Sequence, residues 1–157
     1  MSKDKLLIVG SFPRSDKKIY GGIAKSCKIL LESETFSKYE IQTIDSSQSN
    51  PSPILIIRII NAIKRTFKLL YKFTFDKPKS IIIFCSDGAS AIEKGLMTLI
   101  SRLFNVPVLI FPRAGNLIKQ VNNSKVFLGL IRFMFSNANI FLCQGDRWAN
   151  FAEDILK

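Results

Sequence analysis

The sequence predicts an α/β fold with a single doubly wound parallel sheet flanked by helices. Unbroken apolar runs are typical of parallel strands that are covered on both faces, and such runs occur at 6–10, 81–85, 106–111 and 140–143. Between them lie segments whose apolar residues recur at helical spacing. Strands that alternate with helices form right-handed βαβ units. The length of 157 residues is that of one compact domain.

The first half of the chain is expected to hold two strands and two helices. A strand at 5–10 leads through a glycine-containing loop into a helix at 23–34. A shorter strand follows at 39–44, and the serine- and proline-rich linker after it breaks the pattern. A long helix is expected at 54–75, because a Lys-Pro-Lys sequence follows and stops it before the next strand.

The second half continues the alternation of strands and helices. The expected elements are a strand at 81–85, a helix at 89–104, a strand at 106–111, a helix at 124–135, a strand at 139–143 and a last helix from about Trp148. Ser86 or Asp87 is the expected N-cap of the first of these helices, since short polar side chains accept from free helix amides. Residues 112–116 are expected to form a loop.

The charge of the chain points to an anionic partner. Lysine and arginine number 23 against 12 acidic residues, and the formal charge of +11 fits nucleic acid, acidic phospholipid or a phosphorylated small molecule. Nucleic acid is not expected, because phenylalanines inside apolar runs build a core and not a stacking surface. These are Phe84, Phe111, Phe133, Phe135 and Phe141. No run is long enough to span a bilayer and no signal peptide is recognised, so a cytoplasmic location is expected.

Residue types that are missing exclude whole classes of chemistry. The chain has no histidine, which excludes a Ser-His or Cys-His nucleophile and a histidine-ligated metal. Cys27, Cys85 and Cys143 are far apart in apolar segments, so they are expected to be buried, with no disulfide and no metal. Neither G-x-G-x-x-G nor a P-loop occurs, which argues against a dinucleotide cofactor and an NTPase. No cofactor is expected.

The predicted core strands run directly into polar loops that contain glycine. In open parallel sheets, ligands bind at the carboxyl ends of the strands, where such loops gather. Gly21 and Gly22 stand at the start of the first helix, where backbone amides and the helix dipole suit a diphosphate. Arg14, Arg113 and Arg147 can add bidentate contacts to oxygen atoms. The alternative is that the glycines merely permit tight turns.

Taken together, these segments resemble one enzyme family. They are the strand at 6–10, the sequence Tyr20-Gly21-Gly22-Ile23-Ala24, the loop Ser86-Asp87-Gly88 before a helix, and the ending FLCQGDRW at 141–148. They are similar to the N-terminal, acceptor-side half of GT-B glycosyltransferases of the family 4 type. The resemblance covers nearly the whole chain and half of such an enzyme. It implies one Rossmann-like domain over 1–157, with the C-terminal donor-binding domain absent.

The resemblance also implies an activity and a set of site residues. The activity is transfer of a sugar from a nucleotide-sugar donor to a glycan or lipid-linked acceptor, in the assembly of bacterial surface polysaccharide. Gly21 and Gly22 would contact the donor diphosphate, while acceptor binding would fall on Arg14, Asp87, Arg113, Asn116, Gln144 and Arg147. Many relatives have a histidine where this chain has the stretch around Arg113, and a guanidinium is a poor general base. No catalytic residue is assigned, because retaining members of the family are thought to need no enzymic base.

The long helix expected at 54–75 carries cations and no acid. On a helical wheel the cations fall within an arc of roughly 120°, and they are Arg58, Lys64, Arg65, Lys68 and Lys72. Isoleucine and phenylalanine fill much of the rest, and this apolar face is wider than a helix on a sheet needs. The surplus can enter a membrane interface while the cations meet anionic headgroups. The alternatives are a buried crossover helix with a solvated basic face, and contact with a partner helix or a missing domain.

Two classes of function remain open from the sequence. The first is a glycosyltransferase half that works at the inner face of the cytoplasmic membrane and is completed by a separate donor-binding domain or chain. The second is not catalytic. It is a Rossmann-like or flavodoxin-like binding module, or a membrane-recruiting subunit of a split transferase.

Overall fold

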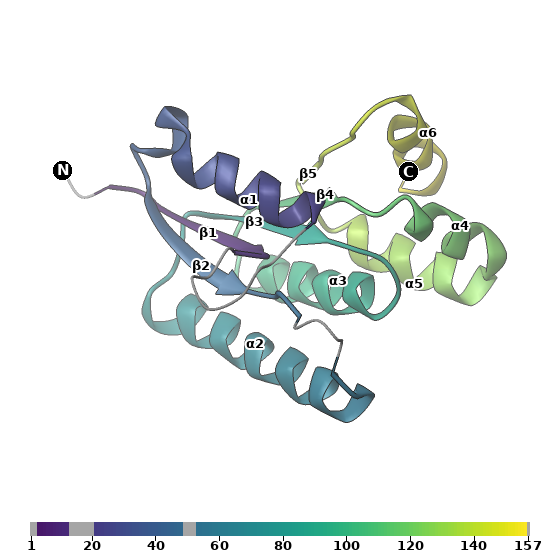
Figure 1. Ribbon diagram of the computed structural model, residues 1–157, viewed down its shortest axis with the longest axis horizontal. Helices are drawn as coiled ribbons and strands as arrows, with labels where there is room; N and C mark the ends of the chain where they lie inside the picture. Colours follow the sequence, from purple (N-terminus) through teal and green to yellow (C-terminus); the bar gives the residue numbers. More distant parts are fainter. Residues whose placement is uncertain (1–2, 13–20, 49–52, 157) are drawn as a thin grey trace. The chain divides into compact units, whose positions relative to one another are not determined.

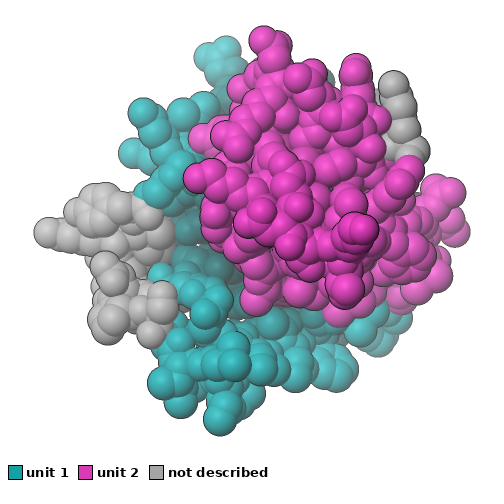
Figure 2. Space-filling view, turned by 90° about the vertical axis from the view of Figure 1, so that its right-hand side faces the viewer, with its two compact units in different colours: residues 1–80 teal, residues 81–157 magenta. Residues whose placement is uncertain are grey.

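The computed structural model describes residues 3–12, 21–48 and 53–156. It confirms the α/β class: a five-stranded parallel sheet, in the order β2-β1-β3-β4-β5, is flanked by helices (Figure 1). The chain divides into two compact units, residues 1–80 (unit 1) and 81–157 (unit 2), which Figure 2 colours separately.

Unit 1 is built around two paired strands. Its elements are β1 (Lys5–Gly10), α1 (Gly22–Glu32), a 3₁₀ turn η1 (Glu34–Phe36), β2 (Glu40–Asp45) and α2 (Leu55–Phe75). β1 and β2 are parallel and in register from Lys5 opposite Glu40 to Gly10 opposite Asp45. In Figure 1, α1 and α2 lie on opposite sides of these strands. Crossover helices on both faces explain why β1 is apolar and buried from Leu6 to Gly10.

Unit 2 contains the remaining strands and helices. They are β3 (Ser80–Cys85), α3 (Gly88–Leu103), β4 (Val108–Pro112), α4 (Asn116–Asn123), α5 (Lys125–Phe135), β5 (Ile140–Phe141) and α6 (Asp146–Ile155). β3 pairs in parallel with β4, and β4 pairs in parallel with β5. The carboxyl ends of these three strands therefore share one edge of the unit.

The main differences from the expected elements are an additional helix and a shortened strand. The stretch before Lys125 contains α4, which the sequence analysis did not anticipate, and its buried side chains Leu117, Ile118 and Val121 recur at helical spacing. The last strand is confined to Ile140–Phe141, not 139–143. Beyond β5 the chain turns into α6, whose Trp148 and Phe151 pack against Phe141 with ring centroids 6.2 and 6.1 Å from it.

A polar network ties the C-terminal end of α2 to the strands of unit 1. Asp76, which follows the helix, accepts from Lys5 of β1 and, at 2.6 Å, from Nε2 of Gln42 of β2. Lys72 Nζ donates to Gln42 Oε1 at 3.0 Å. Gln42 is buried, and this network gives its amide partners on both sides.

The pH dependence of stability is expected to report on Asp76. The hydrogen bond from Lys5 holds the pKa of the Asp76 carboxyl below its usual value, so its stabilisation is present above about pH 4 and is lost as the pH falls toward the lowered value. Asp76→Asn should lower the urea midpoint near neutral pH and weaken its fall in acid. Asp154→Asn, on the exposed surface of α6, serves as the control. Parallel acid profiles for the wild type and Asp76→Asn would contradict this expectation.

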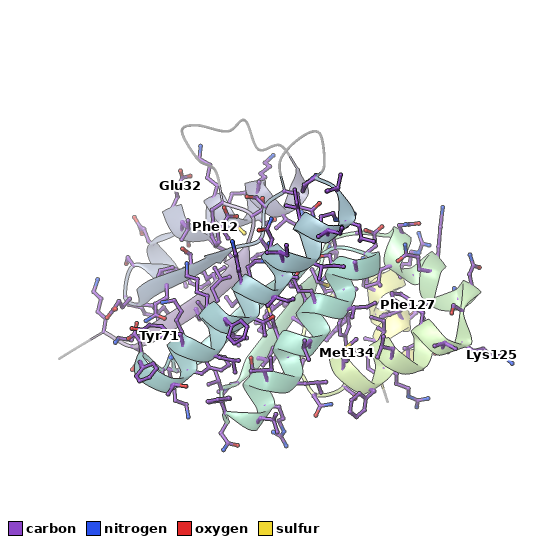
Figure 3. All side chains as sticks on the ribbon, turned by 90° about the horizontal axis from the view of Figure 1, so that it is seen from below. Phe12, Glu32, Tyr71, Lys125, Phe127 and Met134 are labelled. Carbon is purple, nitrogen blue, oxygen red and sulfur yellow. The ribbon has the colours of Figure 1, made fainter. Side chains whose placement is uncertain are left out.

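A close helix contact in unit 2 depends on Gly95. α3 and α5 pack together, and a Cβ placed on Gly95 would lie 2.9 Å from Cβ of Met134 and 2.7 Å from its Sδ. Figure 3 labels Met134 on α5. We expect Gly95→Val to lower the free energy of unfolding by about 1–3 kcal/mol, as overpacking does. Gly129→Ala, on α5 and with open space around it, should be neutral or stabilise by up to ~1 kcal/mol. Chemical denaturation measures both, and equal effects would disprove the contact.

Candidate functional site

The start of α1 lies in unit 1 and contains the glycines predicted to meet a diphosphate. Gly21 is the N-cap residue with φ 146°, a backbone conformation that favours glycine. Gly22 begins the helix, both glycines are exposed, and no acidic residue occupies the first turn. The positive end of the α1 dipole is therefore not offset by a carboxylate of its own first turn. Arg14 lies outside the described residues.

The carboxyl edge of unit 2 gathers predicted site residues from three loops. Asp87 follows β3, Arg113 and Asn116 follow β4, and Gln144 follows β5. The backbone amide of Arg113 donates to the carbonyl of Cys85 at 2.9 Å, which holds the first two loops together. Gln144 Nε2 donates to the carbonyl of Pro112, and this hydrogen bond joins the loop after β5 to the loop after β4. We call these loops, with the start of α4, the carboxyl-edge site.

Asp87 and Asn116 form the central pair of the carboxyl-edge site. Asn116 Nδ2 donates to Asp87 Oδ2 at 2.8 Å, and Ser86 Oγ donates to Asp87 Oδ1 at 3.2 Å. Asp87 is the N-cap residue of α3, as predicted, but its side chain does not cap the helix. Gln120 does so instead: its Oε1 accepts from the amide of Gly88 at 2.8 Å. The Asp87 carboxylate is thereby left to face the loop of β4.

Gln120 is a site residue that the sequence analysis missed. It lies one helical turn after Asn116 on α4, so the two side chains share a face of that helix. The i, i+4 spacing of two amides after a strand would have indicated the pair, had α4 been recognised.

The two described arginines of the loops have different environments. Arg113 is half-buried, and its guanidinium carbon lies 5.2 Å from the centroid of the Phe111 ring, a cation–π geometry. Arg147 lies in the first turn of α6 and is exposed. Arg113 is therefore a fixed part of the loop after β4, whereas Arg147 presents its charge to solvent.

The chemistry offered by the carboxyl-edge site is that of hydroxyl recognition. A carboxylate accepts hydrogen bonds only, while asparagine and glutamine side chains both donate and accept. Asp87, Asn116 and Gln144 together can therefore orient a hydroxyl group in either sense. Among the described residues, aspartate, glutamate and cysteine side chains form no group of three or more that could hold a metal ion.

Comparisons with protein-family models, curated proteins and solved structures find no match to this chain. Its residues and their geometry are therefore the basis for any functional assignment.

The apolar side of α2 points away from the strands of unit 1. The buried residues of α2 are Leu69 and Phe73, and Phe67 lies roughly 160° around the helix from Leu69. We define the outer face of α2 by a subset of its exposed apolar side chains that share this side of the helix, which are Ile56, Ile59, Ile60, Ile63, Phe67, Tyr71 and Phe75. Figure 3 looks onto this side of the helix and labels Tyr71. The predicted alternative of a buried crossover helix with only a basic exposed face does not describe α2.

The predicted cations of α2 lie along one flank of the outer face. Lys64 and Lys68 are exposed, and Arg58 and Arg65 are half-buried. Lys72 is different, because its ammonium group serves the network with Gln42 and Asp76. No helix in the described parts of the chain is long and apolar enough to cross a membrane.

Two expectations about burial are wrong for individual residues. Cys27 and Cys85 are buried, and burial raises the pKa of their thiols to about 11 and about 12, but Cys143 is exposed. Phe133 is also exposed, whereas Phe84 and Phe135 belong to the core. The exposed residues lie outside the packed face of their segments: Cys143 follows the short β5, and Phe133 lies on the solvent side of α5.

Proposed function

We propose that this chain is the acceptor-side half of a glycosyltransferase. The observation that supports the proposal is the Asp87–Asn116 pair beside Gln144, at the carboxyl ends of parallel strands, where such sheets bind ligands. Carboxylate and amide groups fixed by hydrogen bonds suit the hydroxyl-rich surface of a sugar. A dinucleotide cofactor or an NTP substrate would instead call for the phosphate-binding motifs that the sequence lacks.

In the proposed reaction the anomeric carbon of a nucleotide-sugar is transferred to an acceptor hydroxyl. The bond from this carbon to the diphosphate breaks, a bond to the acceptor oxygen forms, and the acceptor proton is released with the nucleoside diphosphate. Asp87 and Asn116 orient the acceptor hydroxyl, and the amides at Gly21 and Gly22 contact the diphosphate. A separate domain or chain holds the nucleotide. The acceptor is a glycan or a lipid-linked sugar of bacterial surface polysaccharide.

Acceptor binding can be tested on the chain as it exists. Saturation-transfer NMR with methyl glycosides of common hexoses should detect binding to the wild type. Asn116→Ala should weaken this binding about 10-fold, because the variant loses one hydrogen bond to the sugar and one to Asp87. Asn122→Ala, exposed on the same helix, is the matched control. Equal binding by Asn116→Ala and the control would contradict the acceptor role.

Donor binding tests the half-enzyme character separately. Isothermal titration of the chain alone with UDP-glucose should show weak or no binding. Adding a donor-binding chain should restore binding of UDP-glucose. Tight binding of flavin mononucleotide or of a nucleotide by this chain alone would overturn the proposal in favour of a non-catalytic binding module.

A second proposed function, membrane recruitment, rests on the outer face of α2. A continuous exposed surface of isoleucine and aromatic side chains with cations on its flank has the chemistry of an interfacial helix on anionic lipid. We propose that α2 docks the chain on the anionic inner face of the cytoplasmic membrane, where a lipid-linked acceptor would be found. The same surface would serve a membrane-recruiting subunit of a split transferase.

Charge reversal tests the electrostatic part of this docking. Lys64→Glu with Lys68→Glu should weaken binding to vesicles that contain phosphatidylglycerol by about 10- to 30-fold, because each lysine near such a surface contributes about 1 kcal/mol. Lys119→Glu with Lys125→Glu changes the net charge equally on unit 2 and should have a small effect. Equal losses for both pairs would show that net charge alone, and not α2, directs binding.

A further inference from the structure

A small pocket lies on the cationic flank of α2, within unit 1. Its volume is about 140 Å³, and its walls come from α2 and from three described residues that precede the helix. The residues that line it are Ser47, Gln48, Pro53, Ile57, Arg58, Asn61 and Arg65. We call it the α2 pocket.

The charge of the α2 pocket selects an anion. Arg58 and Arg65 are seven residues apart, which is nearly two helical turns, so their side chains leave the same side of α2. The pocket also lies near the start of α2, whose first turn carries no acidic residue. The nearby Asp45 carboxylate accepts from the amide and the hydroxyl of Ser47, both at 2.9 Å, and these donors offset part of its charge.

The size and the donors of the α2 pocket favour a phosphate group. Guanidinium groups bind phosphate oxygens through paired N–H donors, and Asn61 and Gln48 add amide groups to the rim. A volume of about 140 Å³ is smaller than that of pockets for drug-sized ligands, which begin near 300 Å³. A headgroup phosphate therefore fits, and a whole nucleotide-sugar does not.

The position of the α2 pocket links it to the outer face. At about 100° per residue, Ile57 and Asn61 lie between the arginines and the apolar side chains of that face. We propose that the α2 pocket binds the phosphate of an anionic membrane lipid whose acyl chains lie against the outer face of α2. This inference rests on the proposed docking of α2 and gives that docking a specific headgroup contact.

Calorimetry with a soluble short-chain phosphatidic acid tests the pocket without a membrane. Arg58→Gln should weaken its binding at least about 10-fold, since a charge-assisted contact to phosphate is lost. Lys64→Gln is the matched control, because Lys64 is an exposed cation of the same helix outside the pocket. Unfolding curves of both variants establish that each is folded. Equal losses of affinity for Arg58→Gln and Lys64→Gln would contradict binding in the pocket and would indicate non-specific electrostatic attraction to α2.

Two further comparisons distinguish a lipid phosphate from free phosphate, and the pocket assignment from the membrane docking of α2. Inorganic phosphate should bind more weakly than the short-chain lipid, and equally tight binding of both would overturn the lipid assignment. A Phe67→Asp variant should lose binding to vesicles but keep its binding of inorganic phosphate, which has no acyl chains and contacts only the pocket. If wild type binds vesicles but not the short-chain lipid, the membrane docking stands and the pocket assignment fails.

Discussion

Replacing Ile63 and Phe67 together by aspartate is expected to abolish binding to vesicles that contain phosphatidylglycerol. Both side chains belong to the outer face of α2, and Phe67 is 66% exposed. Moving a large apolar side chain out of water contributes about 1.5–3 kcal/mol, so losing two such contacts should weaken binding by at least roughly 100-fold. The free energy of unfolding should not fall, because neither side chain is part of the core. Vesicle co-sedimentation and urea denaturation measure the two quantities.

The matched control for this variant is Val126→Asp with Phe133→Asp. These side chains are also large, apolar and exposed, but they lie on α5 in unit 2, outside α2. They should leave vesicle binding nearly unchanged. Unfolding of the Ile63/Phe67 variant, or conversion of a wild-type dimer into a monomer without loss of vesicle binding, would show that protein covers the outer face of α2.

Phe135→Ala is expected to have the largest effect on stability. Phe135 is 1% exposed in the core of unit 2, where its ring centroid lies 6.3 Å from that of Phe141. Truncating a buried phenylalanine costs about 3–5 kcal/mol through lost contacts and the cavity left behind. That is a large part of the roughly 5–15 kcal/mol that stabilises a typical domain.

Phe133→Ala provides the comparison on the same helix. Phe133 is 62% exposed, so its loss should change the free energy of unfolding by no more than about 0.5 kcal/mol. Chemical denaturation followed by circular dichroism measures both variants. Similar effects of the two truncations would mean that α5 presents a different face to the core.

The sequence predicted the strands better than the faces of the helices. β1, β3 and β4 are unbroken apolar runs, and such runs have few alternatives to a doubly covered sheet. α4 was missed because Asn116, Lys119 and Gln120 give it the polar composition of a loop. In α2 the sequence showed a wide apolar face and a cationic stripe, but only tertiary packing decides that Leu69 and Phe73 turn inward and Phe67 outward.

The loops that form the carboxyl-edge site could be predicted from the sequence, but the hydrogen bonds between their side chains could not. Topology places the residues after β3, β4 and β5 at one edge, so Asp87, Asn116 and Gln144 could be named from the sequence. Which donor meets which acceptor depends on the backbone path. Two hydrogen bonds join residues some thirty positions apart in the sequence: Gly88 donates to Gln120, and Lys72 donates to Gln42. No local sequence pattern indicates such pairs.

The attachment of α2 at one end has a consequence for its exchange with solvent. Its C-terminal part contains both buried residues and the Lys72–Gln42–Asp76 network, whereas its first three turns bury no side chain fully. Amide hydrogens in those first turns should therefore exchange with deuterium well before the amides around Leu69 and Phe73, because local opening there breaks few contacts. The unequal protection makes the early half of α2 a sensitive reporter. Any ligand or surface that the helix engages will slow exchange there first.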